Sequence, residues 1–317
     1  MNHHFEIARF ALAVRAAAFS QDREIRASAS QYGTTYSGPG GGYAVPSDFI
    51  EDIFMRDETA LLPYCDGVPV TSGSVGIPTD GTVPWESSGI KCAWIEEGEA
   101  GSESKPHLDL QQFKLKKLLA LVPLTEELVD DAGAIAAWLP RALSRAATWE
   151  VNKALIQGTG AGVPLGMLNS SALITQTKET GQAANTIIEA NIARMMSRCL
   201  DPFSARWIMN PDALSQVLQL DLYDGPTKTL AGLPITATEA APALGSKGDI
   251  TLANLAGYRV ASRGEQLLSS SHLWFDSGLV AFRLTTRMDG APILAKPTTP
   301  PNSSNTRSHF VTLEART

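Results

Sequence analysis

The stretch that decides the fold is ALIQGTGAGVPLGMLN, residues 154–169, in which four glycines and a proline follow directly on a helical pattern. Glycine-rich turns that hold phosphate come after a strand and before a helix, so that free N–H groups and the positive helix end face the anion. Here the helix comes first, and its carboxyl end carries partial negative charge. We therefore interpret Gly158, Gly160, Gly162 and Pro164 as a structural turn, and not as a nucleotide site.

The residues before this turn predict a long helix that Gly158 ends, with its main part over about residues 134–157. Thr125 is a candidate N-cap, and Glu126 and Glu127 follow it where the helix dipole favours anions. Pro140 either kinks this helix or marks the first turn of its main part, because an interior proline removes a hydrogen bond. The apolar stripe consists of Leu139, Ala142, Leu143, Ala146 and Trp149.

The segment upstream of the helix predicts a strand and a long excursion. Residues 112–124 predict a strand in which Phe113 and Leu115 alternate with Lys114 and Lys116. Residues 74–111 are rich in Gly, Ser, Pro and Glu. A segment of this length without core residues is rare inside a compact domain, so we expect an extended hairpin or a disordered segment.

The N-terminal part predicts an arm without a core of its own. Residues 5–19 place apolar side chains, Phe10 among them, at helical spacing, and residues 28–43 are mostly Gly, Ser, Thr and Tyr. A helix over residues 46–57 and a β-like segment over residues 66–78 follow. We expect the arm to find its partner surface elsewhere.

The part of the chain beyond the turn predicts an α+β arrangement. Two helical stretches, residues 186–200 and 210–220, are separated by a strand-like ARWIMN at residues 205–210. Short strands and turns are expected from there to Leu313. The regular βαβ alternation of a nucleotide-binding sheet is missing from this pattern.

Composition and charge narrow the class of protein. The chain has 317 residues, 44% of them hydrophobic, and a formal net charge of −7, which argues against binding nucleic acid through a strongly basic face. Cys65, Cys92 and Cys199 are widely spaced and predict reduced thiols. No apolar run reaches the roughly 18 residues that a membrane span needs. We expect the chain to be made in the cytoplasm, without a membrane partner.

Catalytic motifs are absent from the sequence. Neither HExxH, GxSxG nor a zinc-type arrangement of His and Cys occurs, so we expect no enzyme activity, no cofactor and no metal site. The carboxylate pairs Glu96/Glu97 and Asp130/Asp131 lack an apolar setting that would separate their pKa values. The histidines are scattered through the chain, as is typical of surface or packing residues; they are His3, His4, His107, His272 and His309.

The predicted arm, long hairpin and long helix have one property in common. None of them can bury its apolar side chains fully within a single copy of the chain. Such elements are explained when neighbouring copies supply the missing surface, as in obligate oligomers that bury upward of about 2,000 Å² per contact. The sequence therefore predicts assembly. The candidate subunit-contact residues are Phe10, Trp85, Trp94, Glu96, Glu97, Glu99, Lys114 and Lys116.

The order of several motifs resembles the major capsid proteins of tailed phages with the HK97-type fold. The resemblance runs over about residues 40–315 and rests on GGGYAVPSDF at residues 40–49, AWIEEGEAGSESKPH at residues 93–107 and NKALIQGTGAGVPLGMLN at residues 152–169. Later segments, RWIMNPDAL, LAGLPITAT, GDITLANLAGYRV, RMDGAPILAK and SHFVTLEA, follow in the family's order. No single motif is specific, but their succession is.

The resemblance implies an α+β, HK97-like capsid fold. Its parts would be an N-terminal arm at 1–45, an E-loop at 74–113 and an A-domain at 187–262, with the P-domain at 46–73, 114–186 (including the spine helix) and 263–317. The implied function is a virion shell of hexamers and pentamers that encloses double-stranded DNA without specific binding. Portal and scaffold or protease partners are implied as well, and an N-terminal scaffolding segment is either separate or already removed.

One family feature is not expected here. Some members cross-link neighbouring subunits through a Lys of the E-loop and an Asn of the closing strands, and this chain offers Lys91 and Lys105 but no Asn over residues 279–290. We therefore expect no such bond. Two other interpretations stay open at this point: an encapsulin-like compartment, which shares the fold but holds cargo enzymes, and a soluble α+β hydrolase.

Overall fold

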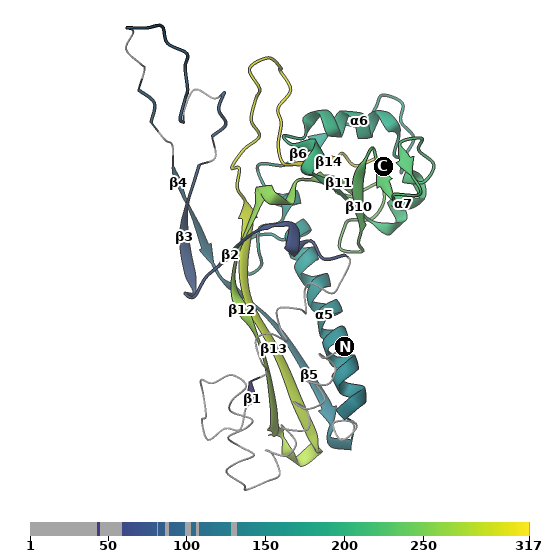
Figure 1. Ribbon diagram of the computed structural model, residues 1–317. Coiled ribbons are helices and arrows are strands. Elements are labelled where there is room, and N and C mark those ends of the chain that lie inside the picture. The colour runs from purple at the N-terminus through teal and green to yellow at the C-terminus, as the bar shows by residue number, and fades with distance from the viewer. Residues whose placement is uncertain are drawn as a thin grey trace. The chain divides into compact units, whose positions relative to one another are not determined.

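The structure is a computed structural model that describes residues 43–44, 59–80, 82–85, 89–98, 103–105, 108–127 and 132–316. Contacts divide the chain into two units (Figure 1). Unit 1 comprises Met1–Pro63, Lys116–Glu150 and Ser262–Met288, and unit 2 comprises Tyr64–Leu115, Val151–Ala261 and Asp289–Thr317. Helix α5 and strands β12 and β13 continue from one unit into the other. The helical expectations for residues 5–19 and 46–57 lie outside the described residues.

Unit 1 is built on an antiparallel sheet with the strand order β1-β12-β13-β5. The strands are β1 Tyr43–Ala44, β12 Tyr258–Trp274, β13 Leu279–Pro292 and β5 Lys116–Thr125. Strand β5 pairs with β13 over ten residues, from Lys116 opposite Met288 to Thr125 opposite Leu279. Because side chains alternate between the two faces of a strand, one face of β5 is more buried than the other.

Two expectations for these strands are wrong. The single strand predicted over residues 112–124 is two strands, β4 Asp109–Lys114 and β5, which belong to different sheets. They meet at Leu115, whose N–H donates to the carbonyl of Gly73 at 3.0 Å and extends the pairing of β4 with residues 74–79 by one residue, whereas Lys116 begins the pairing with β13. The short strands expected beyond residue 220 include two long ones, β12 with 17 residues and β13 with 14, because both extend along neighbouring strands of the sheet.

Helix α5, Ala132–Gln157, ends where the sequence predicts. It begins at Ala132, near the start expected for its main part, so Pro140 lies inside the helix and not in its first turn. Residues 128–131, between this start and the candidate N-cap Thr125, lie outside the described residues. The predicted buried stripe is partly wrong. Leu139 and Leu143 are buried, but Trp149 is exposed, and the buried face continues through Ala147 and Val151 instead. These four residues recur every fourth position, which keeps them on one side of a helix with 3.6 residues per turn.

Unit 2 contains a seven-stranded sheet with the order β6-β14-β11-β7-β10-β9-β8. Helices α6 Glu189–Arg198 and α7 Pro211–Val217 and strand β7 Arg206–Met209 confirm the elements predicted for this region. The other strands are β6 Ile174–Gln176, β8 Tyr223–Asp224, β9 Thr229–Leu230, β10 Leu233–Ala237, β11 Ile250–Ala253 and β14 Phe310–Leu313. Short 3-10 helices occur at Leu62–Tyr64, Met167–Asn169, Pro202–Ser204, Leu255–Gly257 and Phe275–Ser277.

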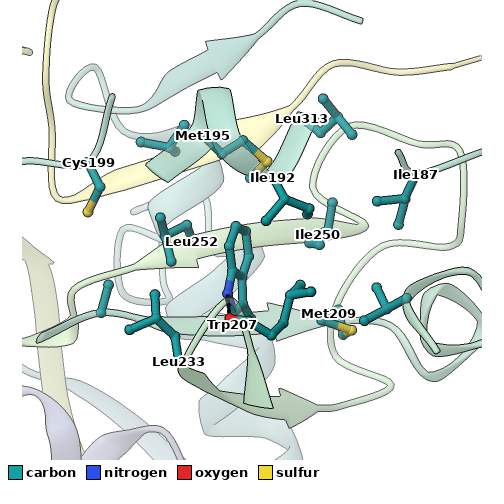
Figure 2. Close-up of a cluster of buried hydrophobic side chains, with 14 of the residues drawn as sticks. Ile187, Ile192, Met195, Cys199, Trp207, Met209, Leu233, Ile250, Leu252 and Leu313 are labelled. Atoms are coloured by element: carbon teal, nitrogen blue, oxygen red, sulfur yellow. Dashed lines mark hydrogen bonds between the residues drawn. The ribbon is translucent and has the colours of Figure 1, made fainter. Parts of the chain in front are cut away.

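The core of unit 2 surrounds Trp207. Figure 2 shows Leu233, Ile250 and Leu252 around its indole ring, and all are buried. The indole Nε1–H donates to the carbonyl of Leu230 at 3.0 Å, so the one polar atom of the side chain is satisfied inside the core. Arg316, near the end of the chain, forms a fully buried ion pair with Asp249 in the same unit. This ion pair joins the residue before β11 to the segment after β14.

The hairpin of unit 2 consists of β3 Ser74–Thr79 and β4, paired from Ser74 opposite Lys114 to Thr79 opposite Asp109. Of the two interpretations of residues 74–111, the extended hairpin is confirmed for these paired residues. Strand β2, Asp66–Pro69, precedes the hairpin and pairs with β12. Within the described residues, no helix has the length and apolar character that a bilayer span needs.

Candidate subunit-contact surfaces

The turn after α5 is held by contacts of its own backbone. The N–H of Gly166 donates to the carbonyl of Gly158 at 2.8 Å, and the Asn169 side-chain amide donates to the same carbonyl at 3.0 Å. Gly160 and Gly162 have φ of 81° and 75°, in the left-handed region that glycine adopts without strain. Because these groups are turned toward one another, they form a structural corner and leave no cradle for an anion.

Further bonds fix this corner to the strands of unit 2. The N–H of Leu165 donates to the carbonyl of Gly290 on β13 at 2.9 Å, and the Leu165 carbonyl accepts the hydroxyl proton of Tyr258 on β12 at 2.8 Å. Burial raises the pKa of Tyr258 well above its usual value, so the hydroxyl stays protonated and remains a donor. The turn therefore joins the helix to both long strands.

Catalytic groups are not brought together in the described part of the chain. The described residues contain no cluster of three or more His, Cys, Asp or Glu that could hold a metal ion. Burial raises the pKa of Cys65 to about 12 and that of Cys199 to about 11, so both thiols stay protonated and unreactive. His309 packs against Phe310, and burial lowers its pKa, which keeps the imidazole neutral.

The hairpin beyond β3 and β4 exposes large apolar side chains. The side chain of Trp94 is 105% exposed, so it makes essentially no contact within its own chain. Glu96 and Glu97 beside it are exposed as well. Trp85, which is closer to β3 in the sequence, is exposed too. Further exposed apolar residues of this segment are Ile90, Ile95, Leu108 and Leu110. An isolated exposed apolar residue is ordinary, but a succession of them on one projecting element marks a contact surface.

The base of the hairpin is held by buried polar groups. The carboxylate of Asp289 on β13 accepts the backbone N–H of Lys114 at 3.0 Å, and the side-chain amide of Gln111 donates to the carbonyl of Pro292 at 2.9 Å. Arg259 on β12 donates to Asp66 at 2.7 Å and to Thr79 on β3 at 2.9 Å. These bonds tie the base of the hairpin to β12 and β13 within unit 2.

The sheet of unit 1 has a face that combines apolar and basic side chains. Leu119 and Leu121 on β5 are 49% and 45% exposed. Leu121 lies opposite Arg283 in the β5–β13 register, and Lys117 lies opposite Arg287; the three basic side chains are exposed. We call this surface, formed by Lys117, Leu119, Leu121, Arg283 and Arg287, the sheet face.

The predicted contact residues are spread over both units. Trp85, Trp94, Glu96 and Glu97 lie on the hairpin and Lys114 at its base, in unit 2, while Lys116 opens β5 in unit 1. Phe10 and Glu99 lie outside the described residues. The sheet face was missed by the sequence reasoning. The alternation of Lys117, Leu119 and Leu121 was visible, but Arg283 and Arg287 join them only through strand pairing.

An α+β subunit with a projecting apolar hairpin and without a catalytic cluster among its described residues fits the class of shell-forming proteins. Comparison with families shows that the chain matches the phage capsid family over residues 41–302. The chain therefore belongs to the phage capsid family. It is a major capsid protein and a structural component of the virion, not an enzyme. No curated protein matches the sequence.

Solved structures with the same fold are distant in sequence. The capsid of an empty GTA particle is 18% identical, with a TM-score of 0.62 over 94% of this chain and 100% of that chain. A structure of Mycobacterium phage Bobi is 16% identical, with a TM-score of 0.55 over 80% and 89%. The satellite phage P4 procapsid is 11% identical, with a TM-score of 0.52 over 92% and 95%. These likenesses show the α+β, HK97-like capsid fold.

Proposed function

We propose that the chain self-assembles as hexamers and pentamers into an icosahedral shell that encloses double-stranded DNA. The observation that carries this proposal is the hairpin, whose exposed Trp94 makes no contact within its own subunit. A ring of head-to-tail contacts closes at five or six copies only when one interface tolerates both angles. A projecting hairpin on a rigid base supplies such a contact, because its tip can adjust while the sheets keep their shape.

In this proposal the segments have the parts that the family resemblance implies. Residues 1–45 are the N-terminal arm, residues 74–113 the E-loop and residues 187–262 the A-domain. The P-domain comprises residues 46–73, 114–186 and 263–317. Portal, scaffold or protease partners would act during assembly. Membership in the phage capsid family favours a DNA-containing shell over an encapsulin-like compartment.

We further propose that the hairpin tip docks on the sheet face of a neighbouring copy. The tip combines apolar Trp94 and Ile95 with acidic Glu96 and Glu97, and the sheet face combines leucines with arginines. Apolar groups therefore meet apolar groups, and opposite charges meet. Lys114 and Lys116 contribute less, since Lys114 lies at the base of the hairpin that carries the tip.

Charge reversal tests this docking. We expect Glu96→Lys/Glu97→Lys to abolish closed shells seen by electron microscopy, because like charges placed across an interface cost several kcal/mol and the contact recurs in every subunit pair. A matched control, Glu150→Lys/Glu239→Lys, reverses two exposed acids that belong to neither surface and should leave the shell yield unchanged.

A charge swap makes the test specific to the sheet face. Adding Arg283→Glu/Arg287→Glu to the hairpin reversal restores opposite charges, so shells should return. If the hairpin reversal alone assembles as well as the unaltered chain, the tip does not dock through these charges. If the swap fails while each variant folds normally by circular dichroism, the tip docks elsewhere.

A further inference from the structure

Helix α5 carries an exposed stripe that lies outside the hairpin tip and the sheet face. It consists of Trp138, Arg141, Arg145 and Trp149, all within the part of α5 that belongs to unit 1. At about 100° per residue, these four positions lie within about 80° of one another around the helix axis. Trp138 is 52% exposed and Trp149 is 43% exposed. We call this surface the α5 stripe.

The charge of the α5 stripe is positive on an acidic chain. Arg141 and Arg145 are exposed, and in the described part of the chain neither guanidinium has a carboxylate within ion-pair distance. Glu150 is the only acid in the sequence of α5, and it points about 100° away from Trp149. The whole chain has a net charge of −7. Two exposed arginines one turn apart therefore make this part of α5 basic on a chain whose net charge is negative.

We propose that the α5 stripe contacts the phosphate backbone of the enclosed double-stranded DNA, an inference that rests on the proposed function. Guanidinium groups bind phosphate through two parallel N–H donors. Arg141 and Arg145 are about 6 Å apart along the axis, so each can contact a phosphate of its own.

The composition of the stripe sets the character of this contact. Phosphates carry no sequence information, so binding is independent of DNA sequence. Two arginines release few counterions, so each contact is weak and is lost as salt rises. The net negative charge of the chain opposes tight binding of DNA, so weak contacts at this stripe position the outer layer of DNA without holding it against movement. The other basic surface, the sheet face, is covered by the hairpin tip in the proposed shell. An acidic protein segment is the competing occupant, which the experiment below distinguishes.

The test measures the binding of a short labelled duplex of random sequence to the unassembled full-length chain across a range of salt concentrations. For Arg141→Gln/Arg145→Gln we expect weaker binding and a slope of log K against log salt that is flatter by about 1.8, since each phosphate contact contributes about 0.9. The control Arg194→Gln/Lys247→Gln removes two exposed cations from unit 2 and makes the same change in net charge. Its slope should match that of the unaltered chain.

Shell formation by the same variants separates this inference from the proposed function. We expect both double variants to form closed shells, because neither touches the hairpin tip or the sheet face. If both variants form shells and show the same slope of log K against log salt for DNA binding, the inference is overturned and the proposed function stays intact. Loss of shells in Arg141→Gln/Arg145→Gln alone, with an unchanged DNA slope, would also overturn it and would assign the stripe to a protein contact. An unaltered chain that never forms shells would contradict the proposed function itself.

Discussion

At the residue scale, the corner after α5 depends on a glycine for reasons of space. A Cβ added to Gly158 would lie 2.1 Å from the carbonyl oxygen of Pro164 and 2.4 Å from that of Ala154. Both atoms are backbone and cannot move aside cheaply. Gly162 has open space around it and needs glycine only for its positive φ. The same turn therefore uses glycine in two different ways.

This difference predicts an order of stabilities. Gly158→Ala should lower the free energy of unfolding by about 3 kcal/mol or more, because overpacking against fixed backbone forces a rearrangement. Gly162→Ala should cost only about 1–2 kcal/mol, the penalty of left-handed backbone for a residue with a Cβ. Gly67→Ala, at a site without close neighbours, is the reference with little change. Urea unfolding of the unassembled chain, followed by circular dichroism, measures all three, and equal losses for Gly158 and Gly162 would contradict the steric explanation.

Sequence reasoning at this scale located the corner but not the surfaces around it. A helix that precedes its glycines excludes a phosphate cradle without any structure. Trp149 was assigned to the buried stripe because it shares helical spacing with Leu139 and Ala142, yet spacing alone does not say where the buried face ends. The pairing of Leu121 with Arg283 spans more than 150 positions of the chain and has no local signal.

At the scale of elements, the hairpin is a rigid attachment that ends in an uncovered tip. Asp289 is 6% exposed, and its two carboxylate oxygens accept the N–H groups of Lys114 at 3.0 Å and of Gly290 at 2.8 Å. One of these donors belongs to the hairpin strand β4 and the other to β13. A single side chain thus joins the two elements at the point where β4 gives way to β5.

Removal of this carboxylate should loosen the base of the hairpin. Asp289→Ala leaves two backbone donors without their partner, at a cost of about 1–3 kcal/mol, and we expect amide exchange along β3 and β4 to rise about tenfold or more. Asp289→Asn keeps the shape of the side chain and one acceptor oxygen. Amide exchange in this variant should therefore lie between that of the unaltered chain and that of Asp289→Ala. Hydrogen–deuterium exchange read by mass spectrometry checks this, with the amides of β7 as an internal reference. Unchanged exchange in β3 and β4 would show that the ladder alone holds the hairpin.

The elements that the sequence predicted well are those with a clear local pattern. Local sequence signals mark these elements, either capping residues or the hydrophobic periodicity of a helix or strand. They are the end of α5, helices α6 and α7 and strand β7. The break at Leu115 was missed because Phe113, Lys114, Leu115 and Lys116 alternate across it. The Lys116-Lys117 pair, which interrupts the alternation, comes only after the break. The length of β12 was missed because SRGEQLLSSSH, residues 262–272, has the composition of a loop and becomes a strand through pairing with its neighbours in the sheet.

At the scale of the whole molecule, the subunit leaves several large apolar side chains exposed, although Trp207 is buried. Trp94 on the hairpin, Leu119 and Leu121 on the sheet face, and the tryptophans of the α5 stripe are all exposed. A soluble hydrolase would instead bury such groups around one cleft with converging polar side chains. Membership in the phage capsid family agrees with apolar surfaces that remain exposed for assembly. The sequence predicted assembly from the arm, the hairpin and the long helix, but it did not identify all the residues that form these surfaces.

The most direct test of the central claim, that one subunit is completed by its neighbours, is electron microscopy of the purified full-length chain as protein concentration and salt are varied. The account predicts closed shells with five-fold and six-fold capsomers, in which the density of the hairpin tip lies on the sheet face of the next copy. A chain that stays monomeric under every condition, or shells in which the hairpin tip contacts no neighbour, would contradict it.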